Sequence, residues 1–161
     1  MDPIPEALIS RHRLEPHPEG GWYRELHRSP LQVSLDGAAD SPRSALTAIL
    51  YLLTDGQRSR WHRLERADEI WHHVAGAPLE LLTLPPDGGR LIRQRLGSPL
   101  LSDRDEPLAV VPAGWWQAAR SLGDWSLLSC DVGPGFEFAD FLLMADLPDG
   151  RRPPGADPSF V

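Results

Sequence analysis

Short runs of strand-forming residues recur along this chain and are separated by turn signals rich in Gly, Pro, Asp and Ser. The runs cover residues 22–28, 44–54, 78–84, 90–96, 108–111, 125–132 and 137–145, and further strands lie in the aromatic stretch 56–76. About nine or ten strands at turn spacings of 8–12 residues are typical of a sandwich or barrel, not of βαβ units. The spacing therefore predicts an all-β fold.

The two ends of the chain do not follow the strand pattern. Ile4, Ala7 and Leu8 recur at helical spacing, which predicts a short N-terminal helix over residues 3–14. The segment 16–21, PHPEGG, cannot continue that helix and predicts a tight turn. We expect residues 1–147 to form a single domain. Residues 148–161 form a Pro/Gly-rich C-terminal tail, predicted to lie as a surface strap or to swing freely.

Charge and cysteine content limit the partners and the compartment. The net charge is −7, and all sixteen basic residues are Arg, so the field of the protein repels nucleic acid and anionic membranes. A single cysteine, Cys130, excludes an internal disulfide framework and suits a reducing compartment. No apolar h-region follows the first residues. We therefore expect a cytoplasmic protein with no nucleic-acid partner and no membrane partner.

Two spaced motifs stand out against this background. Gly56, His62, Leu64, Glu69 and Gly76 give the pattern G-x5-H-x-L-x4-E-x6-G, and VPAGWWQ at 111–117 gives P-x-G-x2-Q. Both resemble the signature motifs of the cupin superfamily, G-x5-H-x-H-x3,4-E-x6-G and P-x-G-x2-H. Leu64 stands where the family usually has a histidine, and so does the glutamine that ends the second motif, Gln117.

A closer resemblance covers about residues 8 to 145. The chain is similar to a small single-domain cupin subfamily catalogued as domain of unknown function 985. The likeness rests on residues 16–21, 23–25, 44–49, 61–63, 68–72, 111–114, 116–118 and 134–141. The resemblance implies a double-sheet jelly-roll barrel, usually dimeric, with a pocket at its mouth. It brings no known reaction, because the fold is shared by deoxysugar-nucleotide epimerases and by seed storage globulins.

The resemblance also implies a set of inward-pointing side chains. In cupins the motif histidines and glutamate point into the barrel, often around a divalent metal. Carried over, the candidate metal ligands here are His62, Glu69 and Gln117, with Leu64 contributing none. An amide is a weak neutral ligand, so a polar pocket without a cofactor is favoured over a metal site, although a divalent metal stays an alternative.

His62 and Glu69 are also the candidate catalytic residues. A buried imidazole and carboxyl can act as general acid and base beside a carbonyl group. The epimerases use a His with an Asp partner and a Tyr, parts that Asp140 and either Tyr23 or Tyr51 could take here. The alternative is a buried pair that only stabilises the barrel. Asp140 itself lies among phenylalanines and needs a cation, for which Arg24, Arg60 and Arg63 are the candidates.

Strand alternation extends the predicted pocket. If Glu69 points inward, Trp71 and His73 share its face and His72 points the other way. The subfamily resemblance instead includes His72, and a β-bulge would reverse the assignment, so the choice stays open. The predicted lining of the pocket comprises His62, Glu69, Trp71, His73, Gln117, Tyr23, Glu25, Thr47 and Tyr51.

Three functions remain open. The first is a cytoplasmic cupin that binds a small, partly apolar molecule bearing a carbonyl or hydroxyl group in its barrel. The second is a metal-independent sugar epimerase or isomerase that uses the His–Glu pair, and the third is a degraded metallo-cupin, an oxygenase or isomerase. We also expect a homodimer, because the exposed edge strands of jelly rolls are commonly protected by pairing across a two-fold axis.

Overall fold

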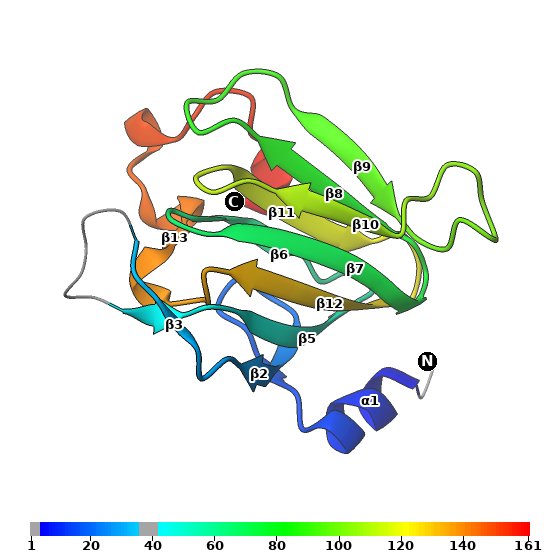
Figure 1. Cartoon of the computed structure of the whole chain (residues 1–161). Coiled ribbons are helices and arrows are strands. Elements are labelled where there is room, and N and C mark those ends of the chain that lie inside the picture. The colour runs from blue at the N-terminus through cyan, green and yellow to red at the C-terminus, as the bar shows by residue number, and fades with distance from the viewer. Residues whose placement is uncertain (1–3, 36–41) are drawn as a thin grey trace.

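A computed structural model describes residues 4–35 and 42–161 of the chain. Its strands form two stacked antiparallel sheets (Figure 1). The six-stranded sheet has the order β1 (Glu15–Pro16), β2 (Trp22–Arg28), β5 (Thr47–Thr54), β12 (Trp125–Gly133), β7 (Asp68–Gly76) and β10 (Leu108–Val111). The five-stranded sheet has the order β13 (Phe141–Leu143), β6 (Ser59–Leu64), β11 (Trp116–Ser121), β8 (Leu79–Leu84) and β9 (Ile92–Leu96). This is a double-sheet jelly roll, and the predicted fold class is confirmed.

One end of the space between the sheets is filled with hydrocarbon. Alternate residues of the facing strands meet there because successive side chains of a strand point to opposite faces. Tyr51 and Trp71 pack edge to face, with ring centroids 5.7 Å apart. The buried cluster around them comprises Leu53, Leu79, Leu81, Leu96, Ala109, Val111, Ala119, Leu128 and Cys130. The other end of the same interior holds a cavity.

The N-terminal helix α1 (Ile4–His12) covers part of the outer face of the six-stranded sheet. Leu8 and Ile9 pack there against Leu50, Leu52 and Leu127. The helix ends two residues earlier than the predicted range 3–14, and residue 3 of that range lies outside the described residues. No helix in the described part of the chain is both long enough and apolar enough to span a bilayer.

Two predicted strands differ from the structure. The run 44–54 is divided into β4 (Arg43–Ser44), which pairs with β3 (Gln32–Val33), and β5. The run 137–145 is mostly helical turns, η1 (Phe138–Asp140) and η2 (Met144–Asp146), around the short strand β13. The predicted partners of Asp140 were wrong, because its carboxylate forms an ion pair with Arg43. This ion pair joins the η1 turn to β4, which helps explain why η1 does not continue as a strand.

Residues 148–161 lie against the outer face of the five-stranded sheet. They contain the turns η3 (Asp149–Arg151) and η4 (Pro158–Phe160). Phe160 is only 2% exposed and packs with Trp61 of β6, whose indole nitrogen donates to the Asp157 carbonyl at 2.9 Å. The segment therefore covers apolar side chains of β6, β8 and β11 that would otherwise face water.

Candidate functional site

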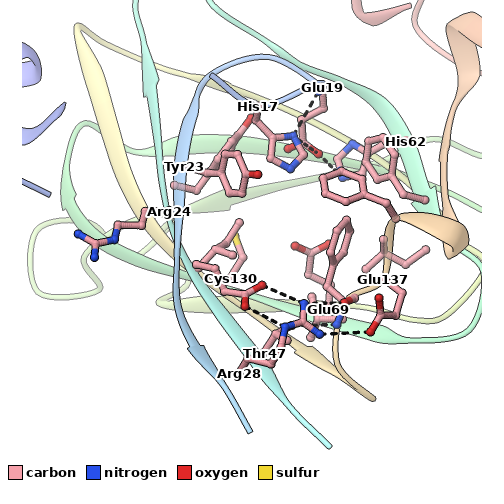
Figure 2. A pocket seen from close by; sticks show the side chains of 18 of the residues that line it. His17, Glu19, Tyr23, Arg24, Arg28, Thr47, His62, Glu69, Cys130 and Glu137 are labelled. Atoms are coloured by element: carbon pink, nitrogen blue, oxygen red, sulfur yellow. Dashed lines mark hydrogen bonds and ion pairs between the residues drawn. The ribbon is translucent and has the colours of Figure 1, made fainter. Parts of the chain in front are cut away.

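A cavity of about 420 Å³ opens at the end of the sandwich opposite the packed core (Figure 2). Both sheets contribute to it, and so do the turn before β2 and the turn around η1. Its polar lining residues are Arg13, Glu15, His17, Glu19, Tyr23, Arg24, Glu25, Arg28, Thr47, Tyr51, His62, Glu69, Cys130 and Glu137. Its apolar lining residues are Ile49, Leu64, Val132, Phe136, Phe138 and Phe141.

The structure brings six of the nine predicted pocket residues to this cavity. They are His62, Glu69, Tyr23, Glu25, Thr47 and Tyr51. The other three do not line it. Gln117 and Trp71 are buried directly behind Glu69, whereas His73 lies further along β7, beyond the hydrophobic cluster around Trp71.

His17 and Glu19 line the cavity although strand alternation gave no reason to expect them. They belong to the turn at residues 16–21, which folds back into the mouth of the barrel. Gly20 has a φ of +113°, and a Cβ at this position would overlap the carbonyl oxygen of Arg58. The turn can therefore approach β6 this closely only with glycine. Its backbone is held by the Tyr51 hydroxyl, which donates to the Gly20 carbonyl at 2.7 Å.

Glu19 joins the two imidazoles of the site. Its Oε2 lies 3.0 Å from Nε2 of His62 and 3.5 Å from Nδ1 of His17, and its Oε1 accepts from the Ser59 hydroxyl at 2.8 Å. All these side chains are nearly inaccessible to bulk water. Figure 2 shows the two rings on either side of Glu19, across the pocket from Arg28 and Glu137. The turn and strand β6 are thus joined through one buried carboxyl group.

The hydrogen bonds determine where the protons lie. Nδ1 of His62 is 2.8 Å from the carbonyl oxygen of Arg60, which can only accept, so Nδ1 carries a proton. Burial lowers the pKa of His62 to about 4, and burial raises the pKa of Glu19 above that of an ordinary carboxyl. The contact between Oε2 of Glu19 and Nε2 of His62 therefore needs a proton between the two atoms, and Glu19 supplies it when the ring is neutral. Both ring nitrogens of His62 are engaged by the protein.

His17 presents its second nitrogen to the cavity. Its Nδ1 accepts from the backbone N–H of Glu19 at 3.2 Å, so in the neutral ring the proton is on Nε2. Burial lowers the pKa of His17 and favours this neutral ring. Nε2 has no hydrogen-bond partner among residues 4–35 and 42–161. His17 is therefore a fixed hydrogen-bond donor at the cavity wall.

Glu69 is held by a chain of two hydrogen bonds that crosses the sandwich. The Trp71 indole N–H donates to the side-chain oxygen of Gln117 at 2.7 Å, and the Gln117 amide donates to Oε2 of Glu69 at 2.5 Å. Burial is the main cause that raises the pKa of Glu69 to about 8, and negative charge on Glu19 acts in the same direction. Glu69 is therefore a neutral carboxylic acid at neutral pH, and its Oε1 is free of the Gln117 bond.

Neither of the two candidate histidines of β7 lines the cavity. His72 points to the outer face, where its Nε2 lies 3.1 Å from Asp131. His73 donates from Nε2 to the Ala77 carbonyl at 3.1 Å, near the far end of the strand. Strand alternation correctly assigned His72 and His73 to opposite faces of β7. His73, however, lies two residues beyond Trp71, past the packed core, and so does not reach the cavity. The predicted lining role of His73 therefore differs from the structure.

The predicted partner of His62 was Glu69 or Asp140, and the structure gives it Glu19 instead. The predicted metal ligands do not fit a metal either. Both His62 nitrogens are engaged, the Gln117 oxygen accepts from Trp71, and Leu64 has no donor atom. No group of three His, Cys, Asp or Glu within the described residues is arranged to hold a metal ion.

Charged residues at the cavity mouth largely neutralise one another. The guanidinium of Arg28 forms two hydrogen bonds of 2.9 Å with Glu25 and one of 3.2 Å with Glu137. The guanidinium of Arg24 turns away from the middle of the pocket and donates to the His12 carbonyl at 3.0 Å (Figure 2). A β-bulge in β2 after Glu25 reverses the alternation, so Arg28 rather than His27 reaches the cavity.

Comparison with known proteins gives a family and a fold. The family described as "Cupin superfamily (DUF985)" matches residues 6–144. A hypothetical protein from Leishmania major is 32% identical, with a TM-score of 0.76 over 85% of each chain. A protein from Shewanella oneidensis is 36% identical, with a TM-score of 0.74 over 86% of this chain and 82% of its own.

More distant structures share the fold alone. Oxalate decarboxylase from Bacillus subtilis is 16% identical, with a TM-score of 0.57 over 83% of this chain and 31% of its own. No curated protein matches the chain.

Proposed function

We propose a binding function for this chain, which belongs to the DUF985 family of the cupin superfamily. In its barrel cavity it binds a small, partly apolar molecule that bears a carbonyl or hydroxyl group. The observation that carries the proposal is the division of the cavity lining. Glu69, His17 and Tyr23 present polar atoms to the interior, and an apolar wall contains Leu64, Val132 and Phe141. Such a cavity suits a ligand with a hydrocarbon body and one or two polar groups.

The three polar groups are available to a ligand. Nε2 of His17 and the hydroxyl of Tyr23 have no hydrogen-bond partner in the part of the chain described, and Glu69 uses only one of its oxygens with Gln117. Burial raises the pKa of Tyr23, so its hydroxyl keeps its proton. Neutral His17, neutral Glu69 and Tyr23 can all donate, which favours a ligand oxygen that accepts hydrogen bonds.

The isomerase alternative loses its predicted base. A general base needs a lone pair that can reach the substrate, and both nitrogens of His62 are engaged with Arg60 and Glu19. The metal alternative loses its ligands for the same reason. Binding without a required metal is therefore the function that the arrangement supports best.

A cavity-blocking variant tests the proposal. Cyclohexanone and cyclohexanol are small probes with an apolar ring and one oxygen, and saturation-transfer NMR detects their binding even when it is weak. Leu64→Trp would fill the apolar wall, because Leu64 lines the cavity. Val74→Trp is the matched control, because Val74 is 52% exposed and lies outside the cavity.

We expect signals from both probes with the wild type and with Val74→Trp, and their loss with Leu64→Trp. Circular dichroism would verify that each variant is folded. Equal signals from all three proteins would contradict the proposal, because the probes would then bind elsewhere.

A further inference from the structure

Glu69 occupies an unusual position for an acidic residue. It is buried, it faces the cavity, and no guanidinium or imidazole forms an ion pair with it among residues 4–35 and 42–161. Its protein partner is the amide of Gln117, whose orientation is fixed because its oxygen accepts from Trp71. An ionised carboxylate at such a place would cost several kcal/mol, whereas a protonated one costs far less.

The surrounding groups also disfavour a negative charge on Glu69. Glu19 faces it from the turn before β2, and Asp131 lies on the neighbouring strand β12; a negative charge on either group raises the pKa of Glu69. Cys130 on β12 keeps its proton, since burial raises the pKa of its thiol. Burial favours the neutral forms of His17 and His62. Of the arginines that line the cavity, Arg28 is paired with Glu25 and Glu137, Arg24 donates to the His12 carbonyl, and Arg13 is exposed to solvent; none of them forms an ion pair with Glu69.

We infer that Glu69 meets the ligand as a neutral carboxylic acid whose O–H donates to a carbonyl oxygen, and that the cavity selects uncharged carbonyl compounds over carboxylates and amines. The Gln117 amide donates to Oε2 of Glu69, so the carboxylic acid proton of Glu69 is on Oε1 and points away from Gln117. The inference rests on the proposed function, because it names the class of ligand that the same cavity would bind.

The charge of the ligand decides the selectivity. A carboxylate would lose its hydration on entering the cavity, and the three arginines that line it, Arg13, Arg24 and Arg28, are exposed to solvent, so they would not compensate it as buried cations would. An ammonium ion would gain from an ionised Glu69 only after that residue had surrendered its proton, and it too would lose hydration beside an apolar wall. Binding of a ketone requires neither the ionisation of Glu69 nor the desolvation of a charged group.

Binding of a ketone should therefore weaken at alkaline pH. Above pH 8 Glu69 ionises and offers only lone pairs to the carbonyl oxygen. At pH 9.5 only about one molecule in thirty keeps the proton, and the apparent affinity falls by the same factor, about thirtyfold from pH 6.5. Tyr23 does not contribute, because its raised pKa keeps its hydroxyl protonated. Glu19 can also ionise, so a variant of Glu69 is needed to identify the group.

The experiment measures the dissociation constant of cyclohexanone by NMR titration at pH 6.5 and pH 9.5. Three proteins are compared: the wild type, Glu69→Gln, and the control Glu106→Gln, whose residue is exposed outside the cavity. We expect the wild type and Glu106→Gln to weaken by about thirtyfold at the higher pH. Glu69→Gln should bind equally at both values, because its amide N–H does not titrate. Cyclohexanecarboxylate and cyclohexylamine should bind the wild type more weakly than cyclohexanone at pH 6.5.

A second measurement separates the two proposals. In protein with ¹³C-labelled glutamate, the side-chain carboxyl signal that is absent from Glu69→Gln belongs to Glu69, and we expect its midpoint near pH 8. A midpoint near the ordinary value of 4.5, ketone binding independent of pH, or a preference for the amine or the carboxylate would overturn the inference while leaving the proposed function standing. If none of the probes binds at either pH, the proposed function fails, and the inference fails with it.

Discussion

Nε2 of His62 lies 3.0 Å from Oε2 of Glu19, so the central imidazole of the barrel is paired with an acid from the turn before β2 rather than with Glu69. This contact leaves Glu69 without a charged partner and engages the last free nitrogen of His62. It also ties the turn that carries His17 to strand β6. The site is thus divided into a structural pair, Glu19 and His62, and a set of donors that face the ligand.

Removal of the Glu19 carboxyl should destabilise the protein. Glu19→Ala leaves Nε2 of His62 and the Ser59 hydroxyl buried without the partner they now share, which should lower the free energy of unfolding by about 2–4 kcal/mol. Urea denaturation followed by circular dichroism measures the change. The exposed control Glu106→Ala should stay within about 0.5 kcal/mol of the wild type. An equally small effect of Glu19→Ala would show that the buried network contributes nothing to stability.

Glu69 should make the protein less stable at alkaline pH. Its pKa is about 8 in the folded protein and 4.5 as the ordinary value, so the folded state holds a proton that the unfolded state has lost. The stability that this proton contributes is complete below pH 4.5 and is lost as the pH rises to 8. Between pH 6.5 and pH 8 the free energy of unfolding should fall by about 1–2 kcal/mol. Glu69→Gln should remove this slope, and an unchanged slope would contradict the assignment.

His62 should remain uncharged well into the acid range. Its pKa of about 4 lies below the ordinary 6.5, so the stability associated with its neutral form is present above pH 6.5 and is lost as the pH falls towards 4. Nitrogen NMR of the imidazole at pH 5.5 should report one protonated nitrogen, Nδ1. A doubly protonated His62 at that pH would indicate an ion pair with Glu19 instead of a neutral pair.

Gly20 should be irreplaceable in the turn that carries His17 and Glu19. Gly20→Ala combines a φ of +113° with an overlap between its Cβ and the Arg58 carbonyl, and should cost about 3 kcal/mol or more. Gly56→Ala is the matched control, because Gly56 has a φ of +76° but open space around it; it should cost only about 1–2 kcal/mol. Thermal or urea unfolding gives both values. Equal costs would mean that the turn does not need its close approach to β6.

The C-terminal segment should contribute to stability. Phe160→Ala removes a ring that is 2% exposed and should cost about 3 kcal/mol. Phe138→Ala, which removes a ring that is 55% exposed, is the control and should cost less than about 1 kcal/mol. If Phe160→Ala unfolds at the same urea concentration as the wild type, the segment does not remain packed on the five-stranded sheet in solution.

The jelly roll could be predicted from the sequence because strand spacing and the two cupin motifs agree. Alternation also placed Glu69 on the inner face of β7 and Tyr23 and Glu25 on that of β2. It failed beyond the bulge in β2, where the phase reverses and Arg28 takes an inward position. A bulge depends on how two strands pair, which a single strand's pattern does not record.

The most informative residues of the site were hidden in a turn. His17 and Glu19 lie in a segment whose prolines and glycines indicate a change of direction, and strand periodicity says nothing about such a segment. A usable signal was the combination of an imidazole and an acid with two consecutive glycines, since Gly20 and Gly21 both adopt positive φ values that permit close packing. The buried pairing of Glu19 with His62 depends on contacts between residues 43 positions apart, which only the folded chain reveals.

The location of a bound ketone shows whether the barrel cavity is the binding site. Intermolecular nuclear Overhauser effects between cyclohexanone and protein methyl groups identify the side chains that surround the ring. We expect contacts with Leu64, Val132 and Ile49, which line the barrel cavity. Contacts confined to the groove beside helix α1, where Ile9 and Trp22 lie, would contradict it, because the barrel would then not be the binding site.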